Sequence, residues 1–311
     1  MKVVVTGSSG FIGRELCKAL LKEPDTFVYG LDRVEPQSPE SQDSFRFQRI
    51  DLSSEQPELS LLKDTDLVFH LAANPEVRIG VEDTDVDYLN NVVATRNLLE
   101  SLKRSHFHGS VVFASTSTVY GEATVVPTPE SYGPLVPISM YGGSKLACEA
   151  LVSSYAKLFD FRARIIRFAN VVGGSSRHGV IYDFVNKLRR DPKKLEILGD
   201  GTQSKSYVHI SDCVNGLLIS SELGGSVEIF NLGTLETTNV RKIAEIVIGE
   251  MKLKDVEIKT GGGTKDGRGW PGDVKKMLLD CGKIRSLGWM YRFSSDEAIT
   301  MAARNMIKRH V

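Results

Sequence analysis

The sequence has no excess charge of either sign and no apolar run of membrane length. Lys plus Arg equals Asp plus Glu, at 39 each in 311 residues, so the formal net charge is zero. A balanced chain lacks the broad basic field that attracts nucleic acid or anionic lipid. A transmembrane helix needs about 18 or more consecutive apolar residues, and the sequence has no such run. We therefore expect neither a nucleic-acid partner nor a membrane partner.

Cysteine is scarce and scattered. The thiols form no CxxC pair or other metal-ligand spacing and stand at Cys17, Cys148, Cys213 and Cys281. No cluster of His, Asp and Glu indicates a metal, and we interpret His70 in FHLAA as a structural hydrogen-bonding residue. Unpaired thiols are typical of a reducing compartment. Because the opening residues, MKVVVTGSSG, lack a signal-peptide core, we predict a cytoplasmic protein.

The first half of the sequence alternates short β-branched runs with helical patterns. The expected strands are KVVVTG, FVYGLD, FRFQRID, DLVFHLAA and GSVVFAST. One helix is expected at about 86–105 and another after Pro137. Continuous apolar strands separated by helices indicate a parallel sheet covered on both faces. The predicted fold class is therefore α/β, with a Rossmann-type doubly wound sheet.

The alternation loosens after RARIIRFANVVG, which reads as one buried strand ending near residue 170. We predict a dinucleotide-binding domain at 1–170, to which about 205–232 returns. A smaller mixed α/β domain for the substrate is expected at 171–311. Two segments, 35–44 and 261–272, are rich in Gly, Pro and polar residues and read as loops.

The segment TGSSGFIG lies between the first strand and the first helix, with glycines at G-x-x-G-x-x-G spacing. Glycines let the backbone approach a pyrophosphate, and the helix N-terminus supplies unpaired N–H groups and a partial positive charge. The loop therefore predicts a dinucleotide site that includes Gly7, Gly10, Phe11, Ile12 and Gly13.

Acidic residues close the second and third strands. Asp32 stands where a carboxylate can accept both ribose hydroxyls of the adenosine half. Its charge repels a 2′-phosphate and favours NAD over NADP, although the neighbouring Arg33 weakens that preference. A turn role is the alternative for Asp32. Asp51 would lie near the adenine, and both a turn role and a ligand role stay open for it.

The stretch YGGSK places Tyr141 four positions before Lys145, which in a helix stacks the two side chains on one face. A tyrosine is a poor base near neutrality, because its usual pKa is about 10. On this spacing alone, a packed tyrosine and a solvated lysine are the simpler interpretation. The surrounding motifs decide between packing and chemistry.

Together the motifs resemble the extended short-chain dehydrogenase/reductase family, and within it the nucleotide-sugar epimerases. The resemblance rests on TGSSGFIG, Asp32, Asp51–Leu52, HLAAN, NNVVAT, STSTVYGE, YGGSK and RFANVVG, in family order over nearly the whole chain. The segments ANPEVR, RHGVIYDF, DGTQSKSY and DGRGWPGD look like archaeal proteins of the UDP-glucose 4-epimerase type. The resemblance implies NAD as the cofactor.

The resemblance also implies catalytic roles. It makes Tyr141 the proton-transfer group and lets Lys145 bind the nicotinamide ribose, where two positive charges would lower the tyrosine pKa. The family position of the third catalytic hydroxyl falls on Thr116, with Ser115 as second choice. The further cofactor contacts that it implies are Leu52, Leu71, Ala72, Ala73, Asn91 and Ser115.

The residues after Thr116 separate the reactions of different relatives. Family dehydratases carry an Asp-Glu pair directly after the threonine, and decarboxylases carry a Glu two positions after it. Ser117 and Thr118 stand there instead, cannot act as carboxyl acid–base groups and are expected to line the pocket. We predict C4 epimerisation of a UDP-sugar through a 4-keto intermediate. The alternatives are a noncatalytic NAD-binding scaffold and a net reductase.

The substrate contacts are implied by the resemblance. They are the diphosphate contacts Asn170 and Arg268, the cation Lys205, the ribose contact Asp273 and the backbone of Val180 and Ile181 against uracil. A solvent-exposed loop position is the alternative for Arg268.

Two further positions bear on substrate choice. Met277 could leave room for an N-acetyl group, and Arg177 stands where relatives acting on UDP-glucuronate place an arginine. UDP-glucose/UDP-galactose is the first choice, followed by UDP-glucuronate and UDP-N-acetylglucosamine. Family members commonly dimerise through helices near 86–105 and 141–158, which predicts a homodimer built on a four-helix bundle.

Overall fold

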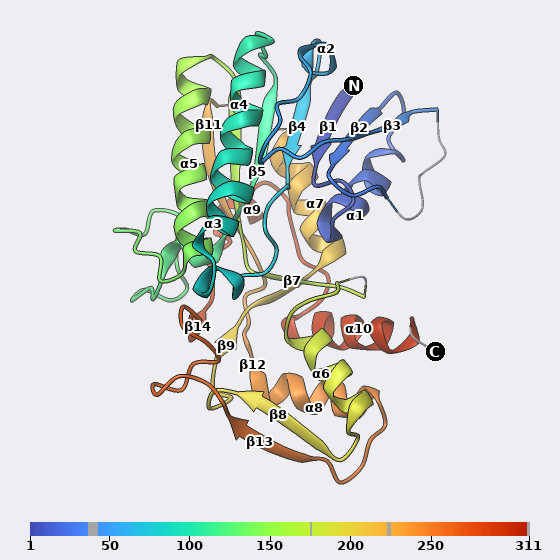
Figure 1. Cartoon of the computed structure of the whole chain (residues 1–311), viewed down its shortest axis with the longest axis vertical. Coiled ribbons are helices and arrows are strands. Elements are labelled where there is room, and N and C mark those ends of the chain that lie inside the picture. The colour runs from blue at the N-terminus through green and yellow to red at the C-terminus, as the bar shows by residue number, and fades with distance from the viewer. Residues whose placement is uncertain (37–42, 175, 223–224, 310–311) are drawn as a thin grey trace. The chain divides into compact units, whose positions relative to one another are not determined.

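A seven-stranded sheet organises the first part of the chain in a computed structural model of the protein (Figure 1). The strand order is β11-β6-β5-β4-β1-β2-β3, and the strands from β3 through β1 to β5 pair in parallel. The order reverses direction between β1 and β4, which is the point where Rossmann folds bind dinucleotides. The predicted α/β doubly wound fold is confirmed.

The structure describes residues 1–36, 43–174, 176–222 and 225–309. The chain divides into two compact units, each assembled from separate segments. The first unit contains 1–119, 140–167 and 214–230, and the second contains 120–139, 168–213 and 231–311. Most of the predicted loop at 35–44 lies outside the described residues.

The predicted alternation of strands and helices appears in the sheet and its flanking helices. The elements are β1 (Lys2–Thr6), α1 (Phe11–Leu20), β2 (Phe27–Asp32), β3 (Phe45–Arg49), α2 (Leu59–Leu62), β4 (Leu67–His70), η1 (Ile79–Val81), α3 (Thr84–Asp87), η2 (Tyr88–Val93), α4 (Ala94–Arg104), β5 (Ser110–Thr116), η3 (Ser117–Tyr120), α5 (Met140–Leu158), β6 (Arg162–Phe168), α7 (Ile210–Ser221) and β11 (Val227–Leu232).

The central strands of the sheet are buried on both faces, whereas the edge strand β3 has no buried residue. All seven residues of β5 are buried, as are all four of β4. Val4 belongs to a core with Leu98 of α4 and Val152 of α5, and these two helices lie side by side (Figure 1). Val3 and Val5 are fully buried and face the other way, since side chains alternate along a strand.

The helix predicted at 86–105 contains an irregularity. It consists of α3, the π-helical turn η2 and α4 in succession. A π-helical turn inside an α-helix is rare and often marks a functional site. It rotates the segment NNVV relative to a regular helix, and Asn91 is buried within it.

The prediction of one strand over RARIIRFANVVG is wrong. The segment forms β6 and the separate strand β7 (Asn170–Val172), which pairs in parallel with β10 (Tyr207–His209). Consecutive N–H groups find different partners, because Ala169 donates to the Leu232 oxygen and Asn170 to the Ser206 oxygen. The chain therefore leaves the large sheet at residue 169.

The second unit has its own small sheets and core. Its other elements are α6 (Val180–Arg190), β8 (Lys194–Leu198), β9 (Ser204–Lys205), β12 (Thr238–Asn239), α8 (Val240–Glu250), β13 (Glu257–Gly261), β14 (Lys276–Met277), α9 (Gly282–Arg285) and α10 (Ser295–Lys308). Helices α6, α8 and α10 pack together around buried Phe184, Ile243 and Ile299. The order β12-β9-β14 forms a three-stranded sheet.

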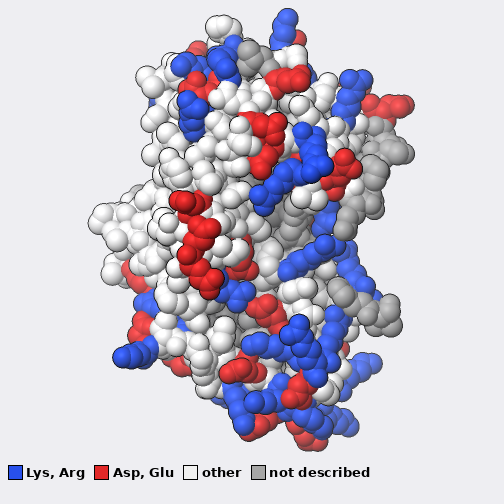
Figure 2. All heavy atoms as spheres, in the orientation of Figure 1, with Lys and Arg blue, Asp and Glu red and all other residues white. Residues whose placement is uncertain are grey.

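No helix in the described part of the chain is long and apolar enough to cross a membrane. Within the same residues, no group of three or more His, Cys, Asp or Glu side chains could hold a metal ion. The four cysteines are free and buried. Figure 2 shows basic and acidic side chains interspersed on the face in view.

Candidate functional site

The glycine loop joins β1 to α1 at the switch point of the sheet. Gly7 has a φ of +70°, and a Cβ there would lie 2.8 Å from the Ala72 nitrogen after β4. A Cβ at Gly13 would lie 2.1 Å from the Gly7 oxygen. Only glycine fits these two positions, so the loop folds tightly against the first turn of α1 and leaves the exposed Gly10 at the helix N-terminus.

The predicted ribose ligand lies next to this loop. The Asp32 carboxylate accepts hydrogen bonds from the backbone N–H groups of Ser9 and Val34, each at 3.0 Å. The exposed Arg33 donates to the Asn90 side chain at 3.0 Å. The carboxylate of Asp51 accepts from the N–H and hydroxyl of Ser53, and these bonds lower the pKa of Asp51. The turn role left open for Asp51 is thus present.

The residues after β4 complete this edge of the sheet. Leu71, Ala72 and Ala73 follow directly, and the Ala72 N–H donates to the Thr6 hydroxyl at 3.2 Å. His70 lies buried between the hydroxyls of Thr6, at 2.7 Å, and Thr95, at 2.9 Å. Burial lowers the pKa of His70 to about 3, so the ring is neutral. The structural interpretation of His70 is confirmed.

Tyr141 and Lys145 stand one turn apart on α5, beside the end of β5. Lys145 is only 2% exposed, and its Nζ donates to the Ala114 oxygen at 2.8 Å. The same ammonium lies over the Phe113 ring, 4.9 Å from its centre. The Thr116 hydroxyl at the end of β5 bonds to Thr118, at 3.1 Å to the hydroxyl and 3.2 Å to the N–H. The lysine is thus buried, unlike the solvated lysine of the simpler interpretation.

The protein groups alone favour the phenol form of Tyr141. Burial raises the pKa of Tyr141 well above its usual range, and the charge of Asp87 adds to this. Burial lowers the pKa of Lys145 to about 8, which weakens its positive field. The expected lowering of the tyrosine pKa depends on two positive charges, and it stays a prediction for the protein with NAD bound.

A buried ion pair between α5 and β6 also binds the residue before Thr116. Glu149 lies one turn beyond Lys145, and its carboxylate accepts from Arg167 Nε at 3.0 Å and Nη2 at 2.7 Å. The Ser115 hydroxyl donates to the same carboxylate. Because the Ser115 hydroxyl is bonded to the carboxylate of Glu149, Thr116 is favoured over Ser115 as the catalytic hydroxyl.

Four of the predicted substrate residues lie together in the second unit. Lys205 on β9 is paired in register with Met277 on β14, and its Nζ donates to Asp273 at 2.5 Å. Asn170 bonds through its N–H and its amide to the oxygen of Ser206. Asp273 also accepts from the Gly269 N–H at 3.2 Å. Lys205 and Asp273 thus form an ion pair with each other.

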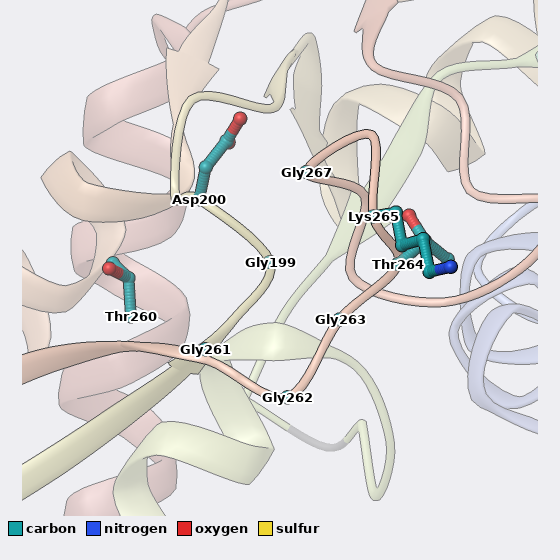
Figure 3. A pocket seen from close by; sticks show the side chains of 9 residues that line it. All are labelled: Gly199, Asp200, Thr260, Gly261, Gly262, Gly263, Thr264, Lys265 and Gly267. Atoms are coloured by element: carbon teal, nitrogen blue, oxygen red, sulfur yellow. The ribbon is translucent and has the colours of Figure 1, made fainter.

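Arg268 extends this cluster. Its guanidinium donates to the carboxylates of Glu122 and Asp266, the latter at 2.6 Å, and to the backbone oxygen of Asp273 at 2.6 Å. It is partly buried, so the interpretation as a free, exposed loop arginine does not hold. A pocket of about 310 Å³ opens beside Gly267, lined by 199–200, 260–265 and 267 (Figure 3).

The remaining predicted positions follow β7. Arg177 is exposed, and Val180 and Ile181 form the first turn of α6 after Gly179. The Ile181 side chain is 3% exposed and packs in the core of the second unit. The expected contact of the Val180 and Ile181 backbone with uracil stays a prediction.

Comparisons with known proteins agree with these motifs. The family model described as "NAD dependent epimerase/dehydratase family" matches residues 3–233. The chain belongs to this family. It is 36% identical over 262 residues to an uncharacterized UDP-glucose epimerase of Bacillus subtilis, covering 79% of this chain and 81% of that protein.

Solved structures of related proteins match this chain over nearly its whole length. A UDP-galactose 4-epimerase is 39% identical, with a TM-score of 0.85 and 99% coverage of both chains. A UDP-glucuronic acid 4-epimerase from Bacillus cereus, in complex with UDP-glucuronic acid and NAD, is 31% identical, with a TM-score of 0.87 and full coverage of both chains. The predicted family, the NAD cofactor and the assignment as an epimerase-type enzyme are confirmed.

The epimerase-family loop fits NAD on its own geometry. The Ser8 and Ser9 hydroxyls and Arg14 Nε are buried without a hydrogen-bond partner in the described part of the chain. They cluster around the glycine loop, where a diphosphate would satisfy them. The loop N–H groups and α1 would hold the diphosphate, and Asp32 would hold the ribose.

Three carboxylates contact or lie beside the predicted site residues and were not among the predicted site residues themselves. Glu149 braces Ser115, Glu122 binds Arg268, and Asp87 lies buried beside Tyr141. One signal was available, because Glu149 continues the helical spacing of Tyr141 and Lys145. The positions of Glu122 and Asp87 depend on chain segments that meet only in the folded protein.

Proposed function

We propose that the protein interconverts UDP-glucose and UDP-galactose by NAD-dependent epimerisation at C4. The observation that carries the proposal is the buried Lys145 one turn after Tyr141, anchored at 2.8 Å to the strand that ends in Thr116. This group stands in the unit that also contains the glycine loop. The 39% identity to a UDP-galactose 4-epimerase structure supports the same sugar.

Each residue would have a distinct role. Tyr141 would take the proton of the C4 hydroxyl and return it after the ketone has turned in the pocket. Thr116 would hydrogen-bond the reacting oxygen, and Lys145 would orient the nicotinamide ribose. Bound NAD supplies a reversible hydride acceptor, which makes a 4-keto sugar accessible with no net redox change.

The neighbourhood of Thr116 supports epimerisation over elimination. Elimination of water and decarboxylation both need an additional acid–base group near the sugar. The next two residues carry hydroxyls, and the Thr118 hydroxyl is bonded to Thr116 at 3.1 Å. The proton chemistry would therefore be confined to Tyr141 and Thr116.

The second unit would bind the nucleotide part of the substrate. Lys205 and Arg268 offer positive charge for the diphosphate, Asn170 an amide, and Asp273 a carboxylate for a ribose. The Lys205–Asp273 pair fixes both side chains at 2.5 Å, and Lys205 also lies over the Trp270 ring. The first turn of α6 would face uracil through its backbone.

UDP-glucuronate is the second candidate substrate. Arg177 is an exposed cation between β7 and α6, and could pair with a sugar carboxylate. For UDP-N-acetylglucosamine the argument rests on Met277, an 8% exposed side chain that can repack around an added group.

The test is a panel of UDP-sugars incubated with purified protein, with products separated by their stereochemistry. We expect UDP-galactose to give UDP-glucose without added NADH, which also separates an epimerase from a net reductase. Tyr141→Phe is the matched inactive control. A protein that binds NAD and converts no member of the panel would be the noncatalytic scaffold.

We also propose a cytoplasmic homodimer. Four free buried thiols suit a reducing compartment. Tyr88 and Leu89 of η2 are 54% and 43% exposed, next to α4, and would be covered by a second copy in the predicted four-helix bundle. Solution scattering is the check, and a monomeric mass would count against the dimer.

A further inference from the structure

Asp87 is a buried carboxylate that the proposed reaction does not use. It is fully buried at the end of α3, directly before the π-helical turn. Its Oδ1 accepts from the amides of Asn74, at 3.0 Å, and Asn91, at 3.3 Å. Its Oδ2 has no hydrogen-bond partner in the described part of the chain. Such an oxygen is costly to bury, so its position calls for a reason.

The Oδ2 atom faces the start of α5. A Cβ at Gly80 would lie 2.4 Å from Asp87 Oδ2 and 3.0 Å from the Met140 Cβ, the residue before Tyr141. Glycine at position 80 therefore leaves the space that Oδ2 occupies. The same carboxylate is linked to Tyr141 by hydrogen bonds. Asn91 donates to the Ser144 hydroxyl at 2.8 Å, and Ser144 donates to the backbone carbonyl oxygen of Tyr141 at 2.8 Å, so the chain of bonds ends at the backbone of Tyr141.

The charge of Asp87 acts on both titratable groups of the turn. It raises the pKa of Tyr141, and it partly offsets the effect of burial on the pKa of Lys145. The other charged or titratable groups that face the lysine are Cys148 and Glu149 on α5 and His70 on β4. Of these groups, Asp87 is the one that acts on the phenol and on the ammonium from outside α5.

We propose that Asp87 is a positioning residue that, in addition to burial, favours the ammonium form of Lys145 and the neutral phenol form of Tyr141 until a cation binds beside the ring. This inference rests on the proposed function, because it assigns a purpose to the protonation of Tyr141. Burial raises the pKa of Asp87, and the hydrogen bonds from the amides of Asn74 and Asn91 counteract that rise and hold the carboxylate in place. Its Oδ2 has no hydrogen-bond partner among the described residues.

The test compares Asp87→Asn with Asp85→Asn. Both remove one carboxylate from α3, but Asp85 is exposed. The direct readout is the NMR titration of isotope-labelled lysine side chains in the NAD-free protein, with Lys145→Met to assign the signal. Wild-type Lys145 should titrate with a pKa of about 8. Asp87→Asn should lower that value by about one pH unit, and Asp85→Asn should leave it in place.

The second readout is the acid limb of kcat/KM for epimerisation. Asp87→Asn should move this limb to lower pH by a similar amount, since the phenolate then forms more easily. If Asp87→Asn fails to fold, Asp87→Ser removes the same charge and leaves room for a water. An unmoved lysine titration in a folded variant overturns the inference, whatever the activity. Full activity of Tyr141→Phe would overturn the proposed function instead.

Discussion

The buried ion pair between Glu149 and Arg167 offers a sharp test of how this fold holds its site. The side chains are 6% and 3% exposed, and two N–H groups of Arg167 meet the carboxylate at 3.0 and 2.7 Å. Glu149→Gln would leave the guanidinium buried and without its counter-charge. Breaking a buried pair on one side costs about 3–5 kcal/mol. Two charge-assisted hydrogen bonds at about 1.5–3 kcal/mol each give about 3–6 kcal/mol, which overlaps that range.

We therefore expect Glu149→Gln to lower the free energy of unfolding by about 4 kcal/mol in urea titration. Turnover should fall as well, because Ser115 beside Thr116 loses its partner. Glu149→Leu with Arg167→Met should recover most of the stability, since both charges leave together. Recovered stability without recovered turnover would separate the ion pair from the Ser115 contact.

The matched control is an ion pair of the same geometry on the surface. Arg304 forms two bonds of 2.8 Å to Glu250 on α8, and its side chain is 54% exposed. Arg304→Met should cost far less than Glu149→Gln, because solvent screens exposed pairs. Equal losses in the two variants, or a double variant no more stable than Glu149→Gln, would refute the reasoning from burial.

Three further predictions concern the cofactor loop, the proton carrier and acid stability. Gly13→Ala should weaken NAD binding and destabilise the fold, because its Cβ would lie 2.1 Å from the Gly7 oxygen. Gly143→Ala should fold normally, because no described atom outside the neighbouring helix backbone lies within 4 Å of its Cβ. NAD titration and urea unfolding check both. Tyr141→Phe should keep NAD affinity and lose turnover by about two orders of magnitude or more. Burial lowers the pKa of His70 from 6.5 to about 3, so between these values the unfolded chain binds a proton at His70 and the native chain does not. The free energy of unfolding should therefore fall as the pH drops from 6.5 toward 3. His70→Asn should remove about 5 kcal/mol of this loss of stability between pH 6.5 and 3. An unchanged pH dependence would exclude His70 as its source.

Much of the first unit could be predicted from the sequence because its signals are local. An apolar strand, a glycine turn and an amphipathic helix each depend on a few neighbouring residues, and the stretch from β1 through TGSSGFIG to α1 shows all three. The stacking of Tyr141 over Lys145 follows from helical periodicity alone. The end of β2 likewise places Asp32 at the loop, where its carboxylate meets the Ser9 N–H.

Only the tertiary structure decided which charged groups and hydroxyls bond to one another. The family motif favours Thr116 with Ser115 as second choice, and only the structure shows that the hydroxyl of Ser115 is bonded to a carboxylate from α5. The segment 120–139 lies between two parts of the first unit yet folds into the second, where Glu122 binds Arg268. Asp87 raises the pKa of Tyr141 across a π-helical turn that no local pattern indicates. The physical reason is that local periodicity fixes which way a side chain points, whereas desolvation and pairing depend on what other segments bring to it.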